Sequence, residues 1–434
     1  MKSTTRRTFL KTSGIGAAAS AMAVAGPSPT ARGAAERITI GLIGCGGRGR
    51  GLAKTFADQK NVKVACVCDP DAKRRAQAKK DTGADHDVAD MRKILSDKSV
   101  DAVIVATTDH WHGPATILAC EAGKHVYVEK PCSHNIREGR LMVEAARRNK
   151  RVVQVGTQSR SSPQIQEAMA LLAEGAIGDV LVAKATNSQR RANIGHAEPS
   201  DPPAHLDYDL WVGPAPMRPY QSNLLHYKWH WFFDFGTGDI GNDGVHDLDI
   251  ARWGLGVQGN PSGASGWADK MFFDDDQQFP DTYYVTFSYP GDGNVGGRRL
   301  LVFEQRDWSP YRQEGHENGN MFYGTKGMMI LGKGGGYQVF GERNKLIKEE
   351  TFGLPTDPHV RNFLDAITGG AKPNADIETG HYAATLAHLG NIVGRVGRSV
   401  VFDPKAERIT GDDEANALTR RTYRHGHWAA PKGV

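Results

Sequence analysis

The chain has 434 residues, a formal net charge of +5 and a charged fraction of 24%. This length allows two domains with hydrophobic cores. The first 35 residues hold five Lys or Arg and no acidic residue, so they account for the whole net charge and the rest is formally neutral. A neutral working part argues against nucleic acid or an anionic membrane surface as the partner.

The chain opens with features of an export signal. A twin-arginine pair lies in RRTFLK at residues 6–11, and an apolar run rich in glycine and alanine follows at 14–25. This run is too short to span a bilayer, no other segment could cross one, and small residues after it offer cleavage sites. Residues 1–35 are therefore predicted to be a twin-arginine signal, which places the working protein in the periplasm. A disordered basic tail is the alternative, and the cleavage site stays open.

The cysteines give no plan for disulfides. Their number is odd, and all of them fall in the first third of the chain, which makes a poor disulfide framework. Cys66 and Cys68 alternate along an apparent strand, which favours core positions over metal ligation. Export without disulfides fits folding in the reducing cytoplasm before transport. The cysteines are Cys45, Cys66, Cys68, Cys120 and Cys132.

The first domain is predicted at residues 36–156, where strand-like and helix-like segments alternate. Alternation of this kind predicts parallel strands joined by helical crossovers, that is, an α/β fold with a doubly wound Rossmann sheet. The strand-like runs are 37–43, 62–69, 101–107, 125–130 and 151–156. Four helical stretches separate them: one that follows the first strand and ends at Ala57, one at 70–80, one near 113–122 and one that begins at Asn135.

A glycine motif directly follows the first strand and predicts a dinucleotide site. Gly44 permits a tight turn, Gly46 lets the backbone approach a pyrophosphate, and Gly49 lets helix and strand pack closely. Asp69 ends the next strand 20 residues after Gly49, where a ribose hydroxyl is held. A carboxylate repels a 2′-phosphate, so NAD is expected in preference to NADP, although the basic residues 73–75 soften this preference.

The second domain is predicted at residues 157–434, where the strict alternation stops. Strand-like runs separated by Gly- and Asp-rich turns dominate, which predicts an open, largely antiparallel sheet in a second α/β domain. Helical segments at 359–367 and from about 378 to 398 are expected to return and pack on the first domain. The clearest strand-like runs are 179–186, 281–289, 298–306 and 327–332.

Several motifs together give a family resemblance. VYVEKP at 126–131 sets Glu129, Lys130 and Pro131 at the end of a strand. With the glycine motif and the segments below, the chain resembles the exported, sugar-oriented branch of the Gfo/Idh/MocA oxidoreductase family over most of its mature length. The resemblance implies a Rossmann domain, an α/β domain beside the cofactor, and a homo-oligomer. The further segments are DHWH (109–112), DLWVGPAP (209–216), GDIGNDGVHDLDIARW (238–253) and HVRNFLDAI (359–367).

The resemblance assigns proton transfer to Lys130. In the family this lysine lies beside the nicotinamide and contacts the hydroxyl that is oxidised. A partly desolvated lysine next to a positive ring has a lowered pKa and can accept a proton. Glu129 is expected to orient it at the cofactor, and Pro131 to fix the turn, in the family often through a cis bond. The alternative is an ordinary surface lysine at a strand end.

The second catalytic candidate is His246. Relatives carry an Asp four residues before this histidine, on the same helical face, but this chain has Asn242, with Asp243 shifted by one. Asn cannot take a proton but can hold a hydroxyl by donating and accepting hydrogen bonds. This departure puts a simple Asp-Lys-His relay in doubt. Asp249 is expected to brace the helix, and a purely structural His246 is the alternative.

The remaining candidates lie at other strand ends and in an aromatic segment. His112 is expected near the cofactor, where Trp111 could wall the ring. A metal site from His110 and His112 is the alternative, but no cluster of acids and cysteines has ligand spacing, so no metal site is expected. Gln158 and Arg160 resemble substrate-side residues, with a plain loop as the alternative.

The aromatic segment 227–239 offers Trp229 as a stacking face for a sugar and His230 as a hydroxyl partner; a buried strand is equally compatible. The basic pair Arg190 and Arg191 is predicted to lie in a solvated loop.

These features favour an NAD-dependent oxidoreductase acting on a small carbohydrate: a sugar, glycoside or polyol. An exported enzyme has no NAD pool, so tightly bound, recycled NAD is expected. The first alternative is a redox-neutral glycosidase or lyase that oxidises a sugar hydroxyl transiently. The second alternative is a non-catalytic sugar or nucleotide sensor, which the presence of Lys130 and His246 disfavours.

Overall fold

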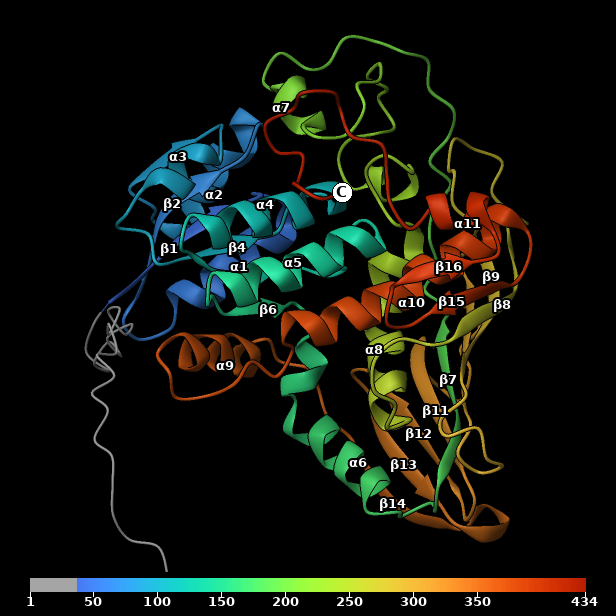
Figure 1. The fold of residues 1–434 in the computed structure, drawn as a ribbon. Coiled ribbons are helices and arrows are strands. Elements are labelled where there is room, and N and C mark those ends of the chain that lie inside the picture. Colours follow the sequence, from blue (N-terminus) through green and yellow to red (C-terminus); the bar gives the residue numbers. More distant parts are fainter. Residues whose placement is uncertain (1–36) are drawn as a thin grey trace, which may run out of the picture.

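The computed structural model describes residues 37–434, which build two β-sheets with helices packed against them (Figure 1). The proposed twin-arginine signal, residues 1–35, lies outside the described residues. From residue 37 onward, no helix combines the length and apolar character needed to span a membrane.

The first sheet has six parallel strands in the order β3-β2-β1-β4-β5-β6, which confirms the predicted doubly wound sheet. Its inner strands are apolar and buried on both faces, as parallel strands between helical layers must be. The strands are β1 (Ile38–Ile43), β2 (Val62–Cys68), β3 (His86–Val88), β4 (Ala102–Val105), β5 (His125–Val128) and β6 (Val153–Val155).

Side chains cap two of the helices of this domain at their first turn. Asp71 accepts hydrogen bonds from two backbone N–H groups at the start of α2, and Asn135 does the same for Glu138 N–H at the start of α5. The structure adds β3 and α3, which were not predicted, and α4 begins four residues earlier than expected, so DHWH lies in its first turn. The helices are α1 (Gly47–Ala57), α2 (Ala72–Thr82), α3 (Arg92–Ser96), α4 (Asp109–Glu121) and α5 (Ile136–Arg148).

The second sheet has ten strands in the order β14-β13-β12-β11-β7-β10-β9-β8-β15-β16. Of its described pairings only β7 with β10 is parallel, so the largely antiparallel prediction is confirmed. The strands are β7 (Val180–Asn187), β8 (Gly263–Asp269), β9 (Thr282–Tyr289), β10 (Arg299–Arg306), β11 (Asn318–Gly324), β12 (Met328–Gly332), β13 (Gly336–Phe340), β14 (Leu346–Glu350), β15 (Val400–Asp403) and β16 (Arg408–Thr410).

One face of this sheet carries the core and the other is open. Along β9, Tyr283, Val285 and Phe287 are buried, whereas Tyr284 between them is 45% exposed. This period of two is that of an antiparallel strand with one packed face. The helices that follow the first domain are α6 (Pro163–Ala173), α7 (Tyr208–Val212), α8 (Val245–Gly254), α9 (Asp357–Ile367), α10 (Ile377–Val396) and α11 (Asp413–Ala417).

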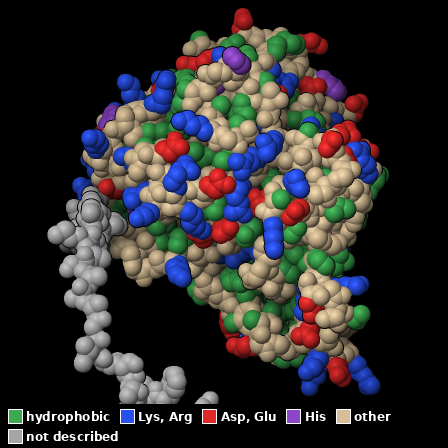
Figure 2. Space-filling model, viewed as in Figure 1, with side chains coloured by type: hydrophobic (Ala, Val, Ile, Leu, Met, Phe, Trp, Pro, Cys, Tyr) green, Lys and Arg blue, Asp and Glu red, His purple; other side chains and the backbone are tan. Residues whose placement is uncertain are grey.

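Two helices of the second half return to the first domain, as predicted. Phe363 of α9 packs edge-on against Phe56 and Tyr127, with ring centroids 5.9 Å from each. Helix α10 lies beside α5 and α8 (Figure 1). Ion pairs cross this junction, including Arg140 to Glu378 at 3.0 Å. Figure 2 shows basic and acidic side chains intermixed on this face of the molecule.

All five cysteines lie in the described part of the chain, and each is free and buried. Cys66 and Cys68 are therefore core residues of β2, as predicted.

Candidate active site

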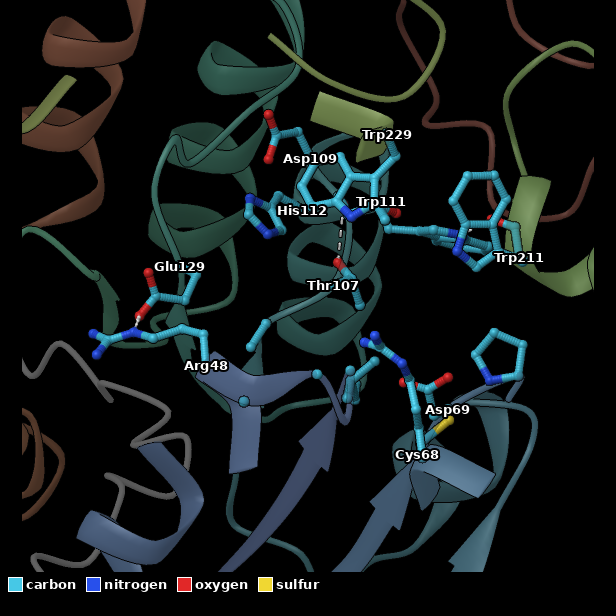
Figure 3. A pocket seen from close by; sticks show the side chains of 18 of the residues that line it. Arg48, Cys68, Asp69, Thr107, Asp109, Trp111, His112, Glu129, Trp211 and Trp229 are labelled. Carbon is cyan, nitrogen blue, oxygen red and sulfur yellow. Dashed lines mark hydrogen bonds and ion pairs between the residues drawn. The ribbon is translucent and has the colours of Figure 1, made fainter. Parts of the chain in front are cut away.

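A cavity of about 510 Å³ lies at the carboxyl ends of the first sheet's strands. Clefts at this edge of an open α/β sheet are where ligands bind, and the volume is in the range of small-molecule sites. Figure 3 shows Glu129 and Arg48 at one side of it and Asp69 at the other. The walls come from the loops after β1, β2, β3, β4 and β5, and from the later segments around 210, 228, 242 and 428.

The glycine motif forms a cradle that side chains would fill. Gly44 has φ +97°, and a Cβ there would lie 2.4 Å from the Ala106 carbonyl oxygen. A Cβ on Gly49 would lie 2.0 Å from Gly44 O. Gly46 faces the cavity just before α1 begins, so the helix N-terminus is open to an anion. These residues fit a dinucleotide pyrophosphate.

Asp69 lines the cavity at the end of β2 and holds the neighbouring loops. Its carboxylate accepts the N–H groups of Cys45 and Asp71, each at 2.8 Å. Burial raises the pKa of Asp69. Of the basic residues 73–75, Arg74 lines the cavity, while the Arg75 guanidinium donates to Asp87 at 3.2 Å. One acid and one guanidinium therefore face the ribose position.

Glu129 links the glycine loop to the Glu-Lys-Pro turn. Arg48 Nε donates to its Oε1 at 2.6 Å (Figure 3). The Lys130 N–H donates to its Oε2 at 3.3 Å. Burial disfavours the carboxylate, but the charges of Arg48 and Lys130 outweigh burial and lower the pKa of Glu129. Glu129 is therefore an ionised brace, consistent with the predicted orienting role.

Lys130 reaches across the cavity to the second domain. Its Nζ donates to the backbone oxygen of Asn242 and lies 3.5 Å from Asn242 Oδ1. Burial lowers the pKa of Lys130 despite the nearby carboxylates of Glu129, Asp243 and Asp109. The Lys130-Pro131 peptide is cis, as the resemblance implied.

His112 stands next to this turn and lines the cavity. Its Nδ1 donates to the carbonyl oxygen of Pro131 at 2.7 Å, which fixes the ring. Its Nε2 is buried and has no hydrogen-bond partner in the described part of the chain. A buried polar atom without a partner beside a cavity is a position for a ligand group.

Asn242 sits in a π-turn, η3 (Ile240–Gly244), directly before α8. π-turns of this kind often occur at functional sites. Its side-chain Nδ2 donates to Asp239 Oδ1 at 2.9 Å and to the Tyr227 hydroxyl at 3.4 Å. Both hydrogen bonds orient the amide so that its oxygen faces Lys130.

His246 lies one turn after Asn242 in α8 but is not among the cavity-lining residues. Its Nδ1 is buried and has no hydrogen-bond partner among residues 37–434. Burial, together with the charges of Lys333 and Lys130, lowers the pKa of His246 well below its usual value. The ring is therefore neutral beside Lys130, and the structure brings it near the reacting lysine without exposing it to the cavity.

Gln158 and Arg160 are held away from the cavity. Both lie in the short 3-10 helix η1 (Gln158–Ser161), and neither lines the cavity. The Arg160 guanidinium pairs with both oxygens of Asp249, each at 2.7 Å. Asp249 thus braces α8 against η1, which supports the predicted bracing role.

The aromatic segment does line the cavity, but it is not a strand. Trp229 and His230 lie in a 3-10 helix, η2 (Lys228–Trp231), with their rings stacked at 3.6 Å, so the buried-strand alternative is wrong. Burial lowers the pKa of His230 to about 3, so the ring is neutral. Tyr227, just before, has φ +78° and lines the same wall. Such a backbone angle is strained for a bulky residue and occurs mostly at functional sites.

Asp109 is a site residue that sequence reasoning missed. It opens α4, lines the cavity, and accepts a hydrogen bond from the Thr237 hydroxyl at 2.6 Å. Burial raises the pKa of Asp109 to about 7. Its position directly after β4, at the ligand-binding edge of the sheet, was the available signal.

A buried charge network lies next to Asn242, and Arg191 belongs to it. Arg191 Nη2 pairs with Asp239 Oδ1 at 2.7 Å, so the expected solvated loop is wrong for this residue. Lys333 Nζ donates to Asp243 Oδ1 at 2.8 Å. The network fixes the turn that carries Asn242. Within residues 37–434, no three or more His, Cys, Asp or Glu are grouped as metal ligands.

The glycine cradle, the acid after β2 and the buried lysine define a dinucleotide-dependent oxidoreductase of two domains. The chain belongs to the Gfo/Idh/MocA oxidoreductase family. Residues 38–157 match the family's NAD-binding Rossmann fold, and residues 180–283 and 325–430 match its C-terminal alpha/beta domain. The family expected from the sequence is thereby confirmed, while its exported branch stays a prediction.

The chain is similar to several curated enzymes. It is 26% identical to levoglucosan dehydrogenase of Pseudarthrobacter phenanthrenivorans over 51% of this chain and 52% of the relative. It is 26% identical to the scyllo-inositol 2-dehydrogenase (NAD(+)) of Bacillus subtilis over 68% and 74%. A glycosyl hydrolase family 109 protein of Shewanella sp. (strain ANA-3) is 33% identical over 32% and 36%. The sequence match therefore spans about half the length of levoglucosan dehydrogenase.

The fold is also shared with a solved structure. The structure of levoglucosan dehydrogenase in complex with NADH and levoglucosan superposes with a TM-score of 0.64 at 19% identity. The superposition covers 84% of this chain and 99% of that one. The two chains therefore share both domains and their arrangement.

Proposed function

We propose that this protein is an NAD-dependent oxidoreductase that acts on a sugar, glycoside or polyol and keeps its NAD bound between turnovers. The observation that carries the proposal is the contact between Lys130, at the end of β5, and Asn242, at the start of α8. This contact joins the dinucleotide cradle to the second domain at one cavity. The dehydrogenases named above act on levoglucosan and scyllo-inositol, which supports a hydroxyl-rich substrate.

NAD is preferred over NADP because Asp69 lies at the ribose position. Bound NAD would take a hydride from a substrate carbon or return it. As the C–H bond breaks, the hydroxyl proton needs an acceptor, and Lys130 with its lowered pKa can supply a neutral amine. The Asn242 oxygens keep that amine aimed at the cavity.

The wall opposite the cradle suits a carbohydrate. Trp229 offers an aromatic face, while His230 and the Tyr227 hydroxyl offer polar groups on the same wall. A mixture of aromatic surface and a few placed polar groups is typical of small-molecule sites. Asp109 also lines the cavity and can accept or donate a hydrogen bond near neutral pH, since its pKa is about 7.

A redox-neutral glycosidase or lyase is the second candidate. Asn242 supports it, because the chain lacks the acid of the usual dehydrogenase relay at this position. The similarity to a glycosyl hydrolase family 109 protein also supports it. In this route, oxidation of one hydroxyl acidifies the neighbouring C–H, a leaving group is lost, water adds, and the hydride is returned.

One experiment separates the two candidates. Purified protein is incubated with a panel of sugars, polyols and glycosides in deuterated water, and both nicotinamide absorbance and product masses are followed. A dehydrogenase gives an oxidised product together with an equal amount of NADH or, when the bound NAD is recycled, of a second compound that has been reduced. A redox-neutral enzyme cleaves a glycoside without net NADH and leaves deuterium beside the oxidised carbon. Binding of these compounds with no turnover would contradict both and favour a sensor.

We also propose that the protein forms a homo-oligomer through the open face of the second sheet. Trp267 and Tyr284 are cross-strand neighbours there, and each is 45% exposed. Paired exposed aromatic rings on a sheet face are typical of protein interfaces. Sedimentation of the wild type and a Trp267→Lys, Tyr284→Lys variant tests this, since a monomeric wild type would contradict it.

A further inference from the structure

The residues after α11 form a segment that crosses back over the first domain, here called the C-terminal strap (residues 421–433). Figure 1 shows this red segment running from α11 to the neighbourhood of α4 and α7. No part of the proposed chemistry uses it, yet one of its residues, Trp428, lines the dinucleotide cavity. The contacts of the strap explain how it reaches that position.

The strap is fixed to α5 by a buried ion pair. Arg421 Nε donates to Glu138 Oε1 at 2.8 Å, and its Nη2 donates to the His110 carbonyl oxygen at 2.7 Å. The Arg421 side chain is 8% exposed and that of Glu138 is fully buried. The Tyr423 hydroxyl donates to the same carboxylate. Two donors on one buried carboxylate hold the strap's beginning firmly.

A second attachment joins the strap to the segment after α7. The Arg424 N–H donates to the Pro214 carbonyl oxygen at 2.8 Å, and its guanidinium pairs with Asp209 at 2.7 Å. Trp211, between these partners, also lines the cavity. The strap and this segment therefore cover the same side of the cavity together.

Trp428 is held in place by the first domain itself. The Arg92 guanidinium lies 4.5 Å from the centroid of its ring, and the Trp111 ring is 5.7 Å away. The following Ala429 is buried in the core of the first domain. The cation over the ring and the tilted Trp111 ring beside it leave the indole little freedom, while the rest of its surface lines the cavity.

The position of Trp428 in the sheet indicates which half of a bound dinucleotide it would contact. Arg92 begins α3, directly after the cavity-lining residues 89–91 that follow β3. Strand β3 borders β2, which Asp69 directly follows, whereas Lys130 follows β5 on the other half of the sheet. In a doubly wound dinucleotide domain these halves hold the two nucleotides separately. Trp428 therefore lies at the adenosine end.

We propose that Trp428 covers the adenine of NAD and that the C-terminal strap retains the cofactor between turnovers. This proposal rests on the proposed NAD-dependent function and assigns a retention role to a residue outside the glycine cradle. Aromatic rings bind bases by stacking in a sequence-tolerant way, and loss of one such ring weakens binding by one to two orders of magnitude. NAD can leave only when the strap lifts.

The test measures cofactor release. Protein loaded with NADH is mixed with excess NAD, and the decay of NADH fluorescence gives the dissociation rate. Trp428→Ala is expected to raise this rate roughly ten-fold or more, and Trp428→Phe to restore most of the retention. Trp308→Ala is the matched control, since it removes a tryptophan that does not line the dinucleotide cavity and should leave the rate unchanged.

Two further measurements make the test specific: the affinities of two fragments of the dinucleotide, and hydrogen exchange in the wild-type protein. ADP-ribose should lose affinity in Trp428→Ala as NADH does, whereas nicotinamide mononucleotide should not. In the wild type, NADH should slow backbone hydrogen exchange in residues 421–430.

An unchanged rate of NADH release from a folded Trp428→Ala variant would overturn the strap proposal alone. So would a rate of backbone hydrogen exchange in the strap that is the same with and without NADH. A wild type that binds no NADH would overturn both the strap proposal and the proposed function.

Discussion

The amine of Lys130 is the single group whose surroundings decide what this site can do. Three carboxylates, those of Glu129, Asp243 and Asp109, favour its charged form, yet burial outweighs them and lowers its pKa. Removal from water therefore dominates over pairwise attraction at this position. The result is a lysine that gives up its proton more readily than an exposed lysine does, which favours the proton transfer that oxidation of a hydroxyl requires.

Replacement of Lys130 by Met should separate turnover from cofactor binding. We expect kcat to fall by roughly two to four orders of magnitude, the usual effect of removing acid–base help. NADH affinity should change little, because the cradle at Gly44 and Gly46 and the acid Asp69 remain. Stopped-flow turnover and an NADH titration check this, with surface Lys98→Met as control. Normal turnover in Lys130→Met would show that another group moves the proton.

Asn242 should reveal its contact with the reacting centre through pH. In Asn242→Asp a new carboxylate would lie beside Asp239, whose Oδ1 now accepts the amide at 2.9 Å. Two adjacent carboxylates raise one pKa, so the pH profile of kcat should gain an ionisation above the ordinary Asp value. The exposed Asn294→Asp serves as control. Identical pH profiles for wild type and Asn242→Asp would place residue 242 outside the chemistry.

Asp109 makes stability depend on pH in a defined direction. Burial raises the pKa of Asp109 from its usual value of 3.8 to about 7 in the folded state. The stability that its protonated form contributes is full below about pH 4 and is lost as pH rises toward about 7. Asp109→Asn should match the wild type in acid and exceed it in free energy of unfolding above pH 7, because Asn still accepts from Thr237. Denaturant melts at both pH values check this, and a pH-independent difference would contradict it.

At the scale of elements, the sequence predicted what depends on local pattern. The glycine motif, the strand ends at Asp69 and Lys130, and the returning helices α9 and α10 all follow from periodicity, turn chemistry or resemblance. Tyr227 and Arg191 were missed or misread because their positions depend on other segments. A left-handed φ at Tyr227 and an ion pair between Arg191 and Asp239 leave no trace in neighbouring residues.

The packing of α5 on α10 depends on a glycine in the first turn of α5. A Cβ on Gly139 would lie 2.3 Å from His381 Nδ1 and 2.9 Å from Ser133 Oγ. Gly139→Ala should therefore destabilise the fold by about 1–3 kcal/mol, because the steric clash costs more than the higher helix propensity of alanine contributes.

Gly51→Ala in α1 is the matched control. A Cβ there meets no other described atom within 4 Å, so this change should stabilise by about 0.5–1 kcal/mol. Urea unfolding of both variants measures the contrast, and equal effects would show that α5 can move away from α10.

At the scale of the whole molecule, the glycine cradle, the C-terminal strap and the proposed export signal all bear on how an exported enzyme keeps its NAD. An exported enzyme meets no pool of free NAD, while the twin-arginine route carries proteins that are already folded. A dinucleotide bound in the cytoplasm can therefore travel with the protein. A catalytic cycle that ends with NAD in its starting form then needs no external supply.

Protein purified from the periplasm and desalted should contain close to one NAD per chain. It should turn over many times without added NAD, with an affinity on the order of nanomolar or tighter, as long residence requires. Substitution of Arg6 and Arg7 by Lys should keep the protein in the cytoplasm and serves as control for the route. An empty protein that needs stoichiometric free NAD would contradict cofactor co-export.

The burial of every thiol has a consequence for how the molecule withstands an oxidising environment. Burial raises the pKa of the Cys120 and Cys132 thiols to about 12, so almost no thiolate is present to react. Oxidants and alkylating reagents can reach these sulfurs only when the domain opens. All the cysteines lie between residues 45 and 132, within the dinucleotide domain. The rate of thiol labelling therefore measures the opening of that domain and does not depend on local unfolding of the second domain. The protein thus carries its own probe of local unfolding, and bound NAD should slow that labelling.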